Sequence, residues 1–284
     1  MTKHPGYDTL VPNEGSLHRM ENERDACGVG FVAQVNGAKS HEILRLALGG
    51  CCAVVHRGAM DSDMKTGDGA GILAQIPHKI LLPVAEYEFG VKLDHPLDLA
   101  VGVFFLPQDE LARIKIQNVA EGAVAKRDVK VIGWRQVPIN PNELGEKARK
   151  TMPCIMHLLM GRPKGMDDGP FERMLYLARR EMMQKAKSLN LADFYVPSMS
   201  HRSIVYKALL VATALGKFYL DLQDERFETA LAVFHQRFST NTFPTWALSH
   251  PFRMLSHNGE INTVRGNRNW MASRAGDFEH PSWE

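Results

Sequence analysis

The 284-residue chain lacks the features that mark several broad classes of protein. No apolar run approaches the ~20 residues that a membrane-spanning helix needs, so we expect no membrane segment. The formal net charge is only +2, and basic residues occur in isolated pairs such as Lys126-Arg127 and Arg179-Arg180. Such pairs are typical of solvated helix faces, and we expect no nucleic-acid partner. Internal repeats and low-complexity stretches are also absent.

Cysteine is scarce, with four residues at Cys27, Cys51, Cys52 and Cys154. The adjacent pair Cys51-Cys52 cannot easily form a disulfide, and no CxxC or iron–sulfur spacing indicates a metal site. The N-terminus has prolines and acidic residues where a secretory signal would have an apolar segment. Reduced thiols in a cytoplasmic protein are the simplest interpretation, and we expect no bound metal.

What the chain does contain is a normal globular composition, with 44% hydrophobic residues, in which strands alternate with helices. Residues 1–26 are polar and proline-bearing, which predicts an extended leader. The predicted strands are Val29–Val35, Ala70–Ile76, Asp98–Leu106, Val129–Gln136, Pro153–Met160, Phe194–Ser198, Ser203–Tyr206 and Glu228–Phe238. The predicted helices are His41–Val55 with Ser40 as its N-cap, Glu110–Lys126, Asn142–Lys150, Phe171–Ala186 and Asn262–Arg274. This pattern favours an α/β or α+β layered domain.

The segment Val233–Asn269 is the most informative part of the chain. It mixes amides, hydroxyls and guanidiniums with anchoring aromatic side chains such as Phe238, Phe243 and Trp246. Because buried polar groups must be hydrogen-bonded, such a mixture is typical of a site and not of a core. The alternative is an irregular polar loop in which Asn258-Gly259 forms a hairpin turn.

Within this segment, HQRFSTNTFPTW and HNGEINTVRGNRNWM resemble the glutaminase part of the large subunit of glutamate synthase, a class II glutamine amidotransferase. Further blocks fit the same family in the same order. They are Cys27–Phe31, His56–Ala59, Thr66–Ile72, Val131–Arg135 and Arg202–Lys207.

The resemblance implies a fold, a domain division and a reaction. The fold would be α+β, the N-terminal-nucleophile hydrolase sandwich with four αββα layers. Residues 1–26 would be a leader or propeptide, and 27–284 a class II glutamine amidotransferase domain that is incomplete at its C-terminal end. The domain would hydrolyse glutamine to glutamate and ammonia, and the ammonia would serve reductive transfer to 2-oxoglutarate in glutamate biosynthesis.

Amide hydrolysis needs a nucleophile, a base and donors to the oxyanion. A cysteine is an effective nucleophile only as thiolate. If the bond between Ala26 and Cys27 is cleaved, the new α-amine has a pKa of roughly 7.7–8.0 and can act as the base. While the leader remains attached, that nitrogen is an amide without basicity. Pairing of Cys27 with a histidine, His235 or His257, is the alternative.

The resemblance also assigns the remaining site residues. The side-chain amide of Asn258 and the backbone N–H of Gly259 would form the oxyanion hole. Arg237 would bind the α-carboxylate of glutamine, a task that suits a planar guanidinium fork. Thr240 would add a hydroxyl contact.

The chain departs from the family in two respects. The large subunit of the family extends into regions that carry FMN and an iron–sulfur cluster, so we expect these cofactors in a downstream synthase domain or partner subunit and none in this chain. The family's aspartate that holds the substrate α-amino group lies downstream of the Asn-Gly pair, and Asp277 is not in the expected setting. Weaker glutamine binding follows for this chain alone.

Several other interpretations remain open. Another class II amidotransferase is possible, as is a non-catalytic regulatory or scaffold subunit that has kept the fold. The GDGAG sequence is similar to a phosphate loop, but it lacks GK[ST] and precedes a predicted strand, so a tight turn is the better interpretation. Asp61, Asp63 and Asp68 are interpreted as structural, with a carboxylate metal site as the alternative.

Overall fold

The computed structural model describes residues 28–63, 65–191, 194–237, 243–254 and 264–278. Two four-stranded antiparallel sheets form its centre, with strand orders β1-β8-β2-β7 and β4-β5-β3-β6. The strands of the first sheet are β1 (Val29–Ala33), β2 (Ala70–Gln75), β7 (Ser203–Ala208) and β8 (Leu231–Gln236). Those of the second are β3 (Leu99–Leu106), β4 (Lys130–Gln136), β5 (Cys154–Gly161) and β6 (Tyr195–Ser200).

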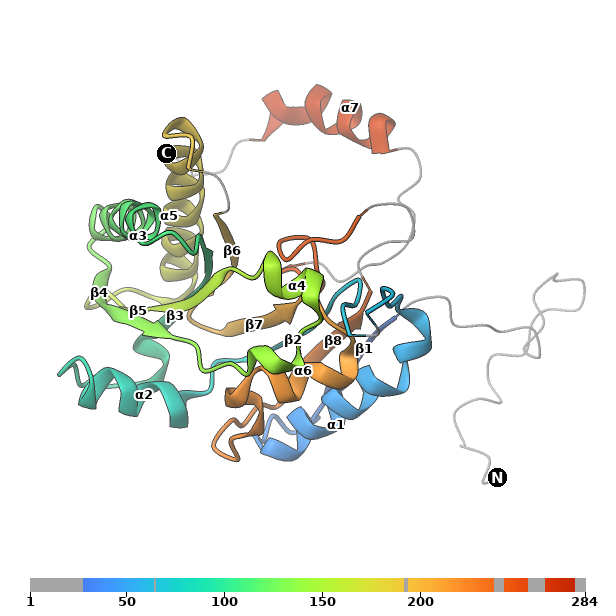
Figure 1. Cartoon of the computed structure of the whole chain (residues 1–284). Helices are drawn as coiled ribbons and strands as arrows, with labels where there is room; N and C mark the ends of the chain where they lie inside the picture. Colours follow the sequence, from blue (N-terminus) through green and yellow to red (C-terminus); the bar gives the residue numbers. More distant parts are fainter. Residues whose placement is uncertain (1–27, 64, 192–193, 238–242, 255–263, 279–284) are drawn as a thin grey trace, which may run out of the picture.

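Helices cover the outer face of each sheet, giving the αββα layers that the resemblance implies (Figure 1). The α-helices are α1 (His41–Ala53), α2 (His78–Tyr87), α3 (Glu110–Ala125), α4 (Glu146–Lys150), α5 (Asp168–Ser188), α6 (Ala212–Phe218) and α7 (Val264–Arg274). Helices α1 and α6 pack on the first sheet, whereas α3 and α5 pack on the second. Among the described residues, no helix is long and apolar enough to cross a membrane.

Strand β3 shows how the layers are held together. All eight of its residues are buried, as expected of a strand covered on both faces. Val101, Val103 and Phe105 join a core that also contains residues of the first sheet. The alternating side chains Phe104 and Leu106 join a second core with α3 and α5. The period of two therefore connects this strand to both neighbouring layers.

The sequence-based helices and strands differ from the structure in several places. Helices α2 and α6 were not predicted. The helix predicted at 142–150 is divided into a 3-10 turn, Pro141–Glu143, and α4, because the backbone is extended at Leu144 and Gly145. The strand predicted at 228–238 begins only at Leu231, where β8 starts.

The first sheet brings three distant parts of the chain to one end of β8. Strand β8 lies between β1 and β2, and β1 is at the sheet edge. The N–H of Gln236 donates to the carbonyl of Gly28 at 2.8 Å, and the N–H of Arg237 donates to the carbonyl of Gly69 at 2.7 Å. The residue after Cys27, the end of β8 and the turn before β2 therefore meet.

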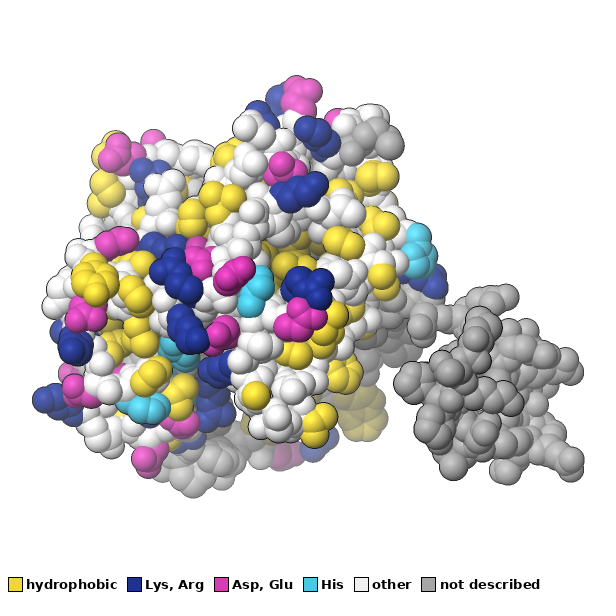
Figure 2. Space-filling model, turned by 90° about the horizontal axis from the view of Figure 1, so that it is seen from below, with side chains coloured by type: hydrophobic (Ala, Val, Ile, Leu, Met, Phe, Trp, Pro, Cys, Tyr) yellow, Lys and Arg dark blue, Asp and Glu magenta, His cyan; other side chains and the backbone are white. Residues whose placement is uncertain are grey.

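The surface carries no block of one charge on the face shown in Figure 2, where acidic, basic and apolar side chains are interspersed. Helix α7 stands clear of the two sheets in Figure 1, and its described side chains from Arg265 onward are exposed. Trp270, exposed to 71%, and Met271 are among them.

Candidate active site

The candidate site is built around Arg237, the first residue after β8. Its backbone has φ = 98°, in the left-handed region that a residue with a Cβ rarely adopts. Such a conformation costs on the order of 1–3 kcal/mol and persists where surrounding contacts fix it. The hydrogen bond from its N–H to the carbonyl of Gly69 is one such contact. The chain therefore leaves the sheet at Arg237 in a fixed direction.

The guanidinium of Arg237 is held by two other segments. Its Nη1 donates to the backbone carbonyl of Arg57 at 2.9 Å, and its Nε lies 3.4 Å from Oδ2 of Asp68. The Asp68 side chain is 7% exposed, whereas that of Arg237 is 26% exposed. The blocks at 56–59 and 66–72 that matched the family thus supply the wall behind this arginine.

Burial raises the pKa of the Asp68 carboxyl to about 6, although backbone hydrogen bonding at Ala59 and the charge of Arg237 act in the opposite direction. The pairing therefore does not fully compensate for removing this carboxylate from water. Asp61 and Asp63 have local roles instead, because Asp61 pairs with Lys147 at 2.6 Å and Asp63 accepts the N–H of Thr66 at 2.7 Å.

Glycines allow the backbones at this site to approach closely. A Cβ at Gly28 would lie 2.2 Å from the carbonyl oxygen of Gln236, and one at Gly58 would lie 2.1 Å from Nε2 of the same residue. Gly69 has φ = 117°, which glycine adopts without strain. The GDGAG sequence is thus a tight turn that enters β2, as predicted.

Lys207 anchors the described segment 243–254. Its fully buried ammonium donates to the carbonyls of Ala247 at 2.8 Å and Ser249 at 2.7 Å. The rings of Tyr195 and Phe252 lie 4.7 Å and 4.5 Å from Nζ. Burial lowers the pKa of Lys207 well below its ordinary value.

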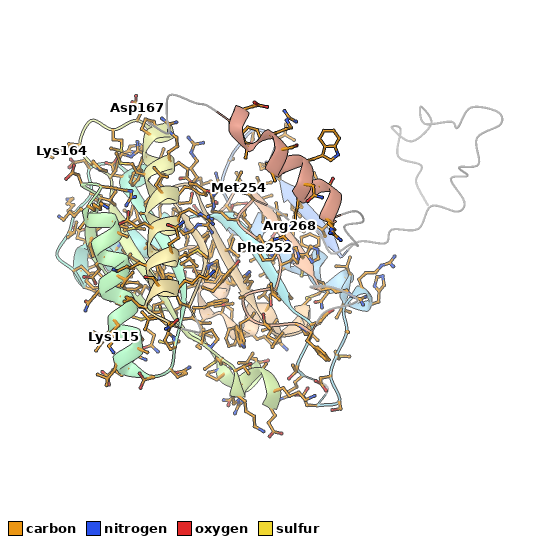
Figure 3. All side chains as sticks on the ribbon, turned by 90° about the horizontal axis from the view of Figure 1, so that it is seen from above. Lys115, Lys164, Asp167, Phe252, Met254 and Arg268 are labelled. Atoms are coloured by element: carbon orange, nitrogen blue, oxygen red, sulfur yellow. The ribbon has the colours of Figure 1, made fainter. Side chains whose placement is uncertain are left out.

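The same segment lies directly on the first sheet. A Cβ at Gly71 would lie 2.5 Å from the carbonyl of His250, so glycine is required there. The ring of His250 stacks on that of His235 in β8, with centroids 4.5 Å apart. Phe252 and Met254 of this segment are labelled in Figure 3, where they lie between α5 and Arg268 of α7 in that view. Arg253 adds an ion pair to Glu172 of that helix.

Of the residues predicted for the site, the structure describes only Arg237. Cys27, Thr240, Asn258 and Gly259 lie outside the described residues. The same holds for His257, one of the two alternative partners of Cys27. The other alternative, His235, is fully buried in β8. Asp277 is exposed in a 3-10 helix, Ala275–Asp277, after α7.

The sequence reasoning missed the roles of Asp68 and Lys207. Asp68 belongs to a block that was interpreted as purely structural, and nothing local indicated that its carboxylate would face Arg237. Lys207 carried a usable signal, because it is the one charged residue in the strand SIVYKA. No group of three or more His, Cys, Asp or Glu side chains that could hold a metal occurs among the described residues.

Comparison with known proteins gives a consistent result. Residues 27–284 match the family described as Glutamine amidotransferases class-II, so the match begins at Cys27. The chain is 46% identical, over 94% of its length, to the Glutamate synthase [NADPH] large chain of Azospirillum brasilense. It is 41% identical, over 96% of its length, to the corresponding chain of Bacillus subtilis. It is also 42% identical, over 92%, to Ferredoxin-dependent glutamate synthase 2 of Synechocystis.

The chain corresponds to a minor part of these relatives. It spans 18% of the length of the Azospirillum and Bacillus proteins and 16% of the Synechocystis protein. The similarity therefore concerns one part of these relatives, the part that corresponds to residues 27–284 of this chain.

Proposed function

Because the chain belongs to the class II glutamine amidotransferases, we propose that it hydrolyses the side-chain amide of glutamine to give glutamate and ammonia. The observation that carries the proposal is the meeting of Gly28, Gln236 and Arg237 at one end of the first sheet. This register brings the residue that follows Cys27 next to an arginine whose guanidinium is held by surrounding groups and is still partly exposed.

In the proposed reaction, the α-amine of a mature N-terminal Cys27 takes the thiol proton. The thiolate then attacks the side-chain carbonyl carbon of glutamine. The carbon–nitrogen bond breaks as the amine returns its proton to the leaving nitrogen, which departs as ammonia and leaves a thioester. Water, deprotonated by the same amine, attacks the thioester, the carbon–sulfur bond breaks, and glutamate and the thiol are restored.

We assign the supporting roles as the resemblance implies. Asn258 and Gly259 donate to the oxyanion of both tetrahedral intermediates, and loss of one such donor typically costs about 10²–10³ in rate. Arg237 binds the α-carboxylate of glutamine, and Thr240 adds a hydroxyl contact. Leader removal before Cys27 creates the base and so activates the enzyme.

The reaction partner is proposed from the relatives. Their names identify glutamate synthases, so we propose that the ammonia serves reductive formation of glutamate from 2-oxoglutarate. A downstream synthase domain or subunit would hold the FMN and the iron–sulfur cluster, and we place the protein in the cytoplasm. If the chain served another class II reaction, the ammonia would reach a different acceptor. If it were a non-catalytic scaffold, Cys27 would not react with glutamine.

The test combines maturation with labelling. Intact-mass measurement should show loss of the first 26 residues, and the matured protein should release ammonia from glutamine. The glutamine analogue 6-diazo-5-oxo-norleucine should label Cys27 alone. Burial raises the pKa of Cys51 to about 12 and raises the pKa values of Cys52 and Cys154 as well, so these thiols are poor nucleophiles.

Two results would contradict the proposal. One is full glutaminase activity with the leader retained, which removes the amine from the mechanism. The other is labelling at Cys154 or at no cysteine, which would favour a scaffold. A Cys154→Ser variant, expected to behave like the unchanged protein, is the matched control.

A further inference from the structure

The contacts of Arg237 account for two of its five N–H groups. The Nε group faces Oδ2 of Asp68 at 3.4 Å, and one Nη1 group donates to the carbonyl of Arg57 at 2.9 Å. The other three N–H groups, including both on Nη2, make no hydrogen bond or ion pair with the residues that the structure describes.

The turn that carries Asp68 also holds the backbone of the same arginine. The N–H of Arg237 donates to the carbonyl of Gly69 at 2.7 Å, while the Asp68 carboxylate lies beside its Nε. Two consecutive residues therefore fix the arginine at both ends. The N–H of Asp68 in turn donates to the carbonyl of Ala59 at 3.1 Å, which ties this turn to the segment that contains Arg57.

Burying the Asp68 carboxylate lowers the stability of the folded protein, because burial disfavours its charged form. Its contact with Arg237 is a single one at 3.4 Å, longer than the 2.7–2.9 Å of a strong charge-assisted hydrogen bond. Asparagine would have nearly the same shape without the charge. The position of Asp68 is therefore better explained by what it does to Arg237 than by stability.

We propose that Asp68 is a positioning residue that fixes the guanidinium plane of Arg237, and thereby determines preference for substrates with a free α-carboxylate. This inference rests on the proposed function. The ion pair from Nε to Asp68 and the hydrogen bond from Nη1 to the carbonyl of Arg57 restrain the plane of the guanidinium and favour one direction for its outer edge. Bidentate binding of a carboxylate requires such a planar fork in one orientation.

The test compares two reagents that attack the same thiol. 6-Diazo-5-oxo-norleucine carries the α-carboxylate of glutamine, and iodoacetamide has none. Second-order rate constants for inactivation or labelling of Cys27 by each reagent are measured in the matured protein, in D68N and in D68L. The ratio of the two rate constants reports carboxylate recognition, whatever the intrinsic reactivity of the thiol.

We expect D68N to lower this ratio by about tenfold, and D68L by up to about a hundredfold, the range of one lost charged hydrogen bond. The rate constant for iodoacetamide should stay within about twofold of that of the unchanged protein, because this reagent has no carboxylate for Arg237 to bind. Asp61→Asn is the matched control. It is the same aspartate-to-asparagine substitution in the same segment, but Asp61 pairs with Lys147 at 2.6 Å and not with Arg237. Its ratio should equal that of the unchanged protein.

The outcomes separate the two proposals. An unchanged ratio in both D68N and D68L, with R237K still lowering it, would overturn the role of Asp68 and leave the proposed function standing. An unchanged ratio in R237K, or failure of the diazo analogue to label Cys27 in the unchanged protein, would overturn the proposed function itself. Should D68L not fold, D68N decides the question, because its side chain has nearly the same volume.

Discussion

Among the residues that the structure describes, two buried aspartates, Asp68 and Asp221, each face an arginine, and they differ in how fully the carboxylate is hydrogen-bonded. Asp221 accepts both Nη groups of Arg135, at 2.7 and 2.8 Å, and the hydroxyl of Tyr206 at 2.8 Å. Asp68 faces Arg237 through one contact of 3.4 Å. The first pair links β4 to the 3-10 helix Leu220–Gln223 and, through the hydroxyl of Tyr206, to β7 of the other sheet, whereas the second lies at the candidate site.

The pKa values of the two carboxyls shift in opposite directions. Burial alone would raise the pKa of Asp221, but the hydrogen bond and charge of Arg135 outweigh it, and the pKa is lowered. At Asp68 burial prevails and the pKa rises to about 6. The Asp221–Arg135 pair is fully hydrogen-bonded, as expected of a pair that stabilises the fold. The Asp68–Arg237 pair makes one long contact, as expected of a pair whose arginine also binds a ligand.

The largest expected effect is at the Asp221–Arg135 pair. Asp221→Leu leaves Arg135 and the Tyr206 hydroxyl buried without their shared acceptor, and we expect the free energy of unfolding to fall by about 3–5 kcal/mol. Urea denaturation would measure it. The reagent ratio at Cys27 should not change in the folded protein, and a lowered ratio would show that the two pairs are coupled.

Lys207 should give an intermediate effect, because it joins the first sheet to the segment at 247–249 through two hydrogen bonds to neutral carbonyls. Lys207→Met removes the donor to two carbonyls in a buried position. We expect a loss of about 2–3 kcal/mol in the free energy of unfolding, since each unsatisfied group costs about 1–3 kcal/mol. Thermal or urea denaturation measures the loss. A change in the free energy of unfolding below about 0.5 kcal/mol would contradict the anchoring role of Lys207.

The pH dependence of stability should distinguish the two carboxyls. Because the folded pKa of Asp68 is raised from 3.8 to about 6, the folded protein binds this proton more tightly than the unfolded chain. Its contribution to stability is therefore complete below about pH 4 and is lost as pH rises through about 6. The loss is at most about 3 kcal/mol, at about 1.4 kcal/mol per pKa unit.

Subtracting the stability curve of D68N from that of the unchanged protein isolates this term. The difference should fall between about pH 4 and 6. Asp221 has the opposite sign, because its lowered pKa gives a contribution that is present above its unfolded pKa and lost as pH falls. A flat difference curve for D68N would show that Asp68 is no more buried electrostatically than a surface carboxyl.

The smallest effect is expected at the surface of the first sheet's helical layer. Glu42 and Arg45 of α1 form an ion pair at 2.6 Å, but both side chains are more than half exposed. Water and salt screen such pairs. Glu42→Gln should leave urea denaturation unchanged within error, and a clear loss would mean that exposure is a poor guide to the value of an ion pair in this protein.

Much of the layered fold followed from local patterns. The strand at 98–106 was predicted within one residue, because an unbroken apolar run bounded by polar residues indicates a strand covered on both faces. Helix α2 was missed although its face toward the core is apolar, since Pro83 lies inside it and interrupts the helical pattern. Helix α6 has only seven residues, too few to show a period.

The site was less accessible to prediction. Arg237 was predicted as a site residue from the motif in which it stands, but its contacts with Arg57 and Asp68 were not predicted. Arg57 lies 180 residues away in sequence, and only the antiparallel register of β1, β8 and β2 brings the segments together. Whether a carboxylate such as Asp68 faces an arginine is decided by tertiary packing, which hydrophobic periodicity does not contain.

The edge position of β1 has a practical consequence for following maturation. Strand β1 pairs only with β8 in the described sheet, and Gly28, the residue immediately before β1, already accepts a hydrogen bond from the N–H of Gln236. An affinity tag placed ahead of Met1 would leave the protein together with the leader without removing any hydrogen bond of the ladder. A tag at each end of the chain would then report processing directly, since the ratio of the two tags in a purified sample equals the uncleaved fraction.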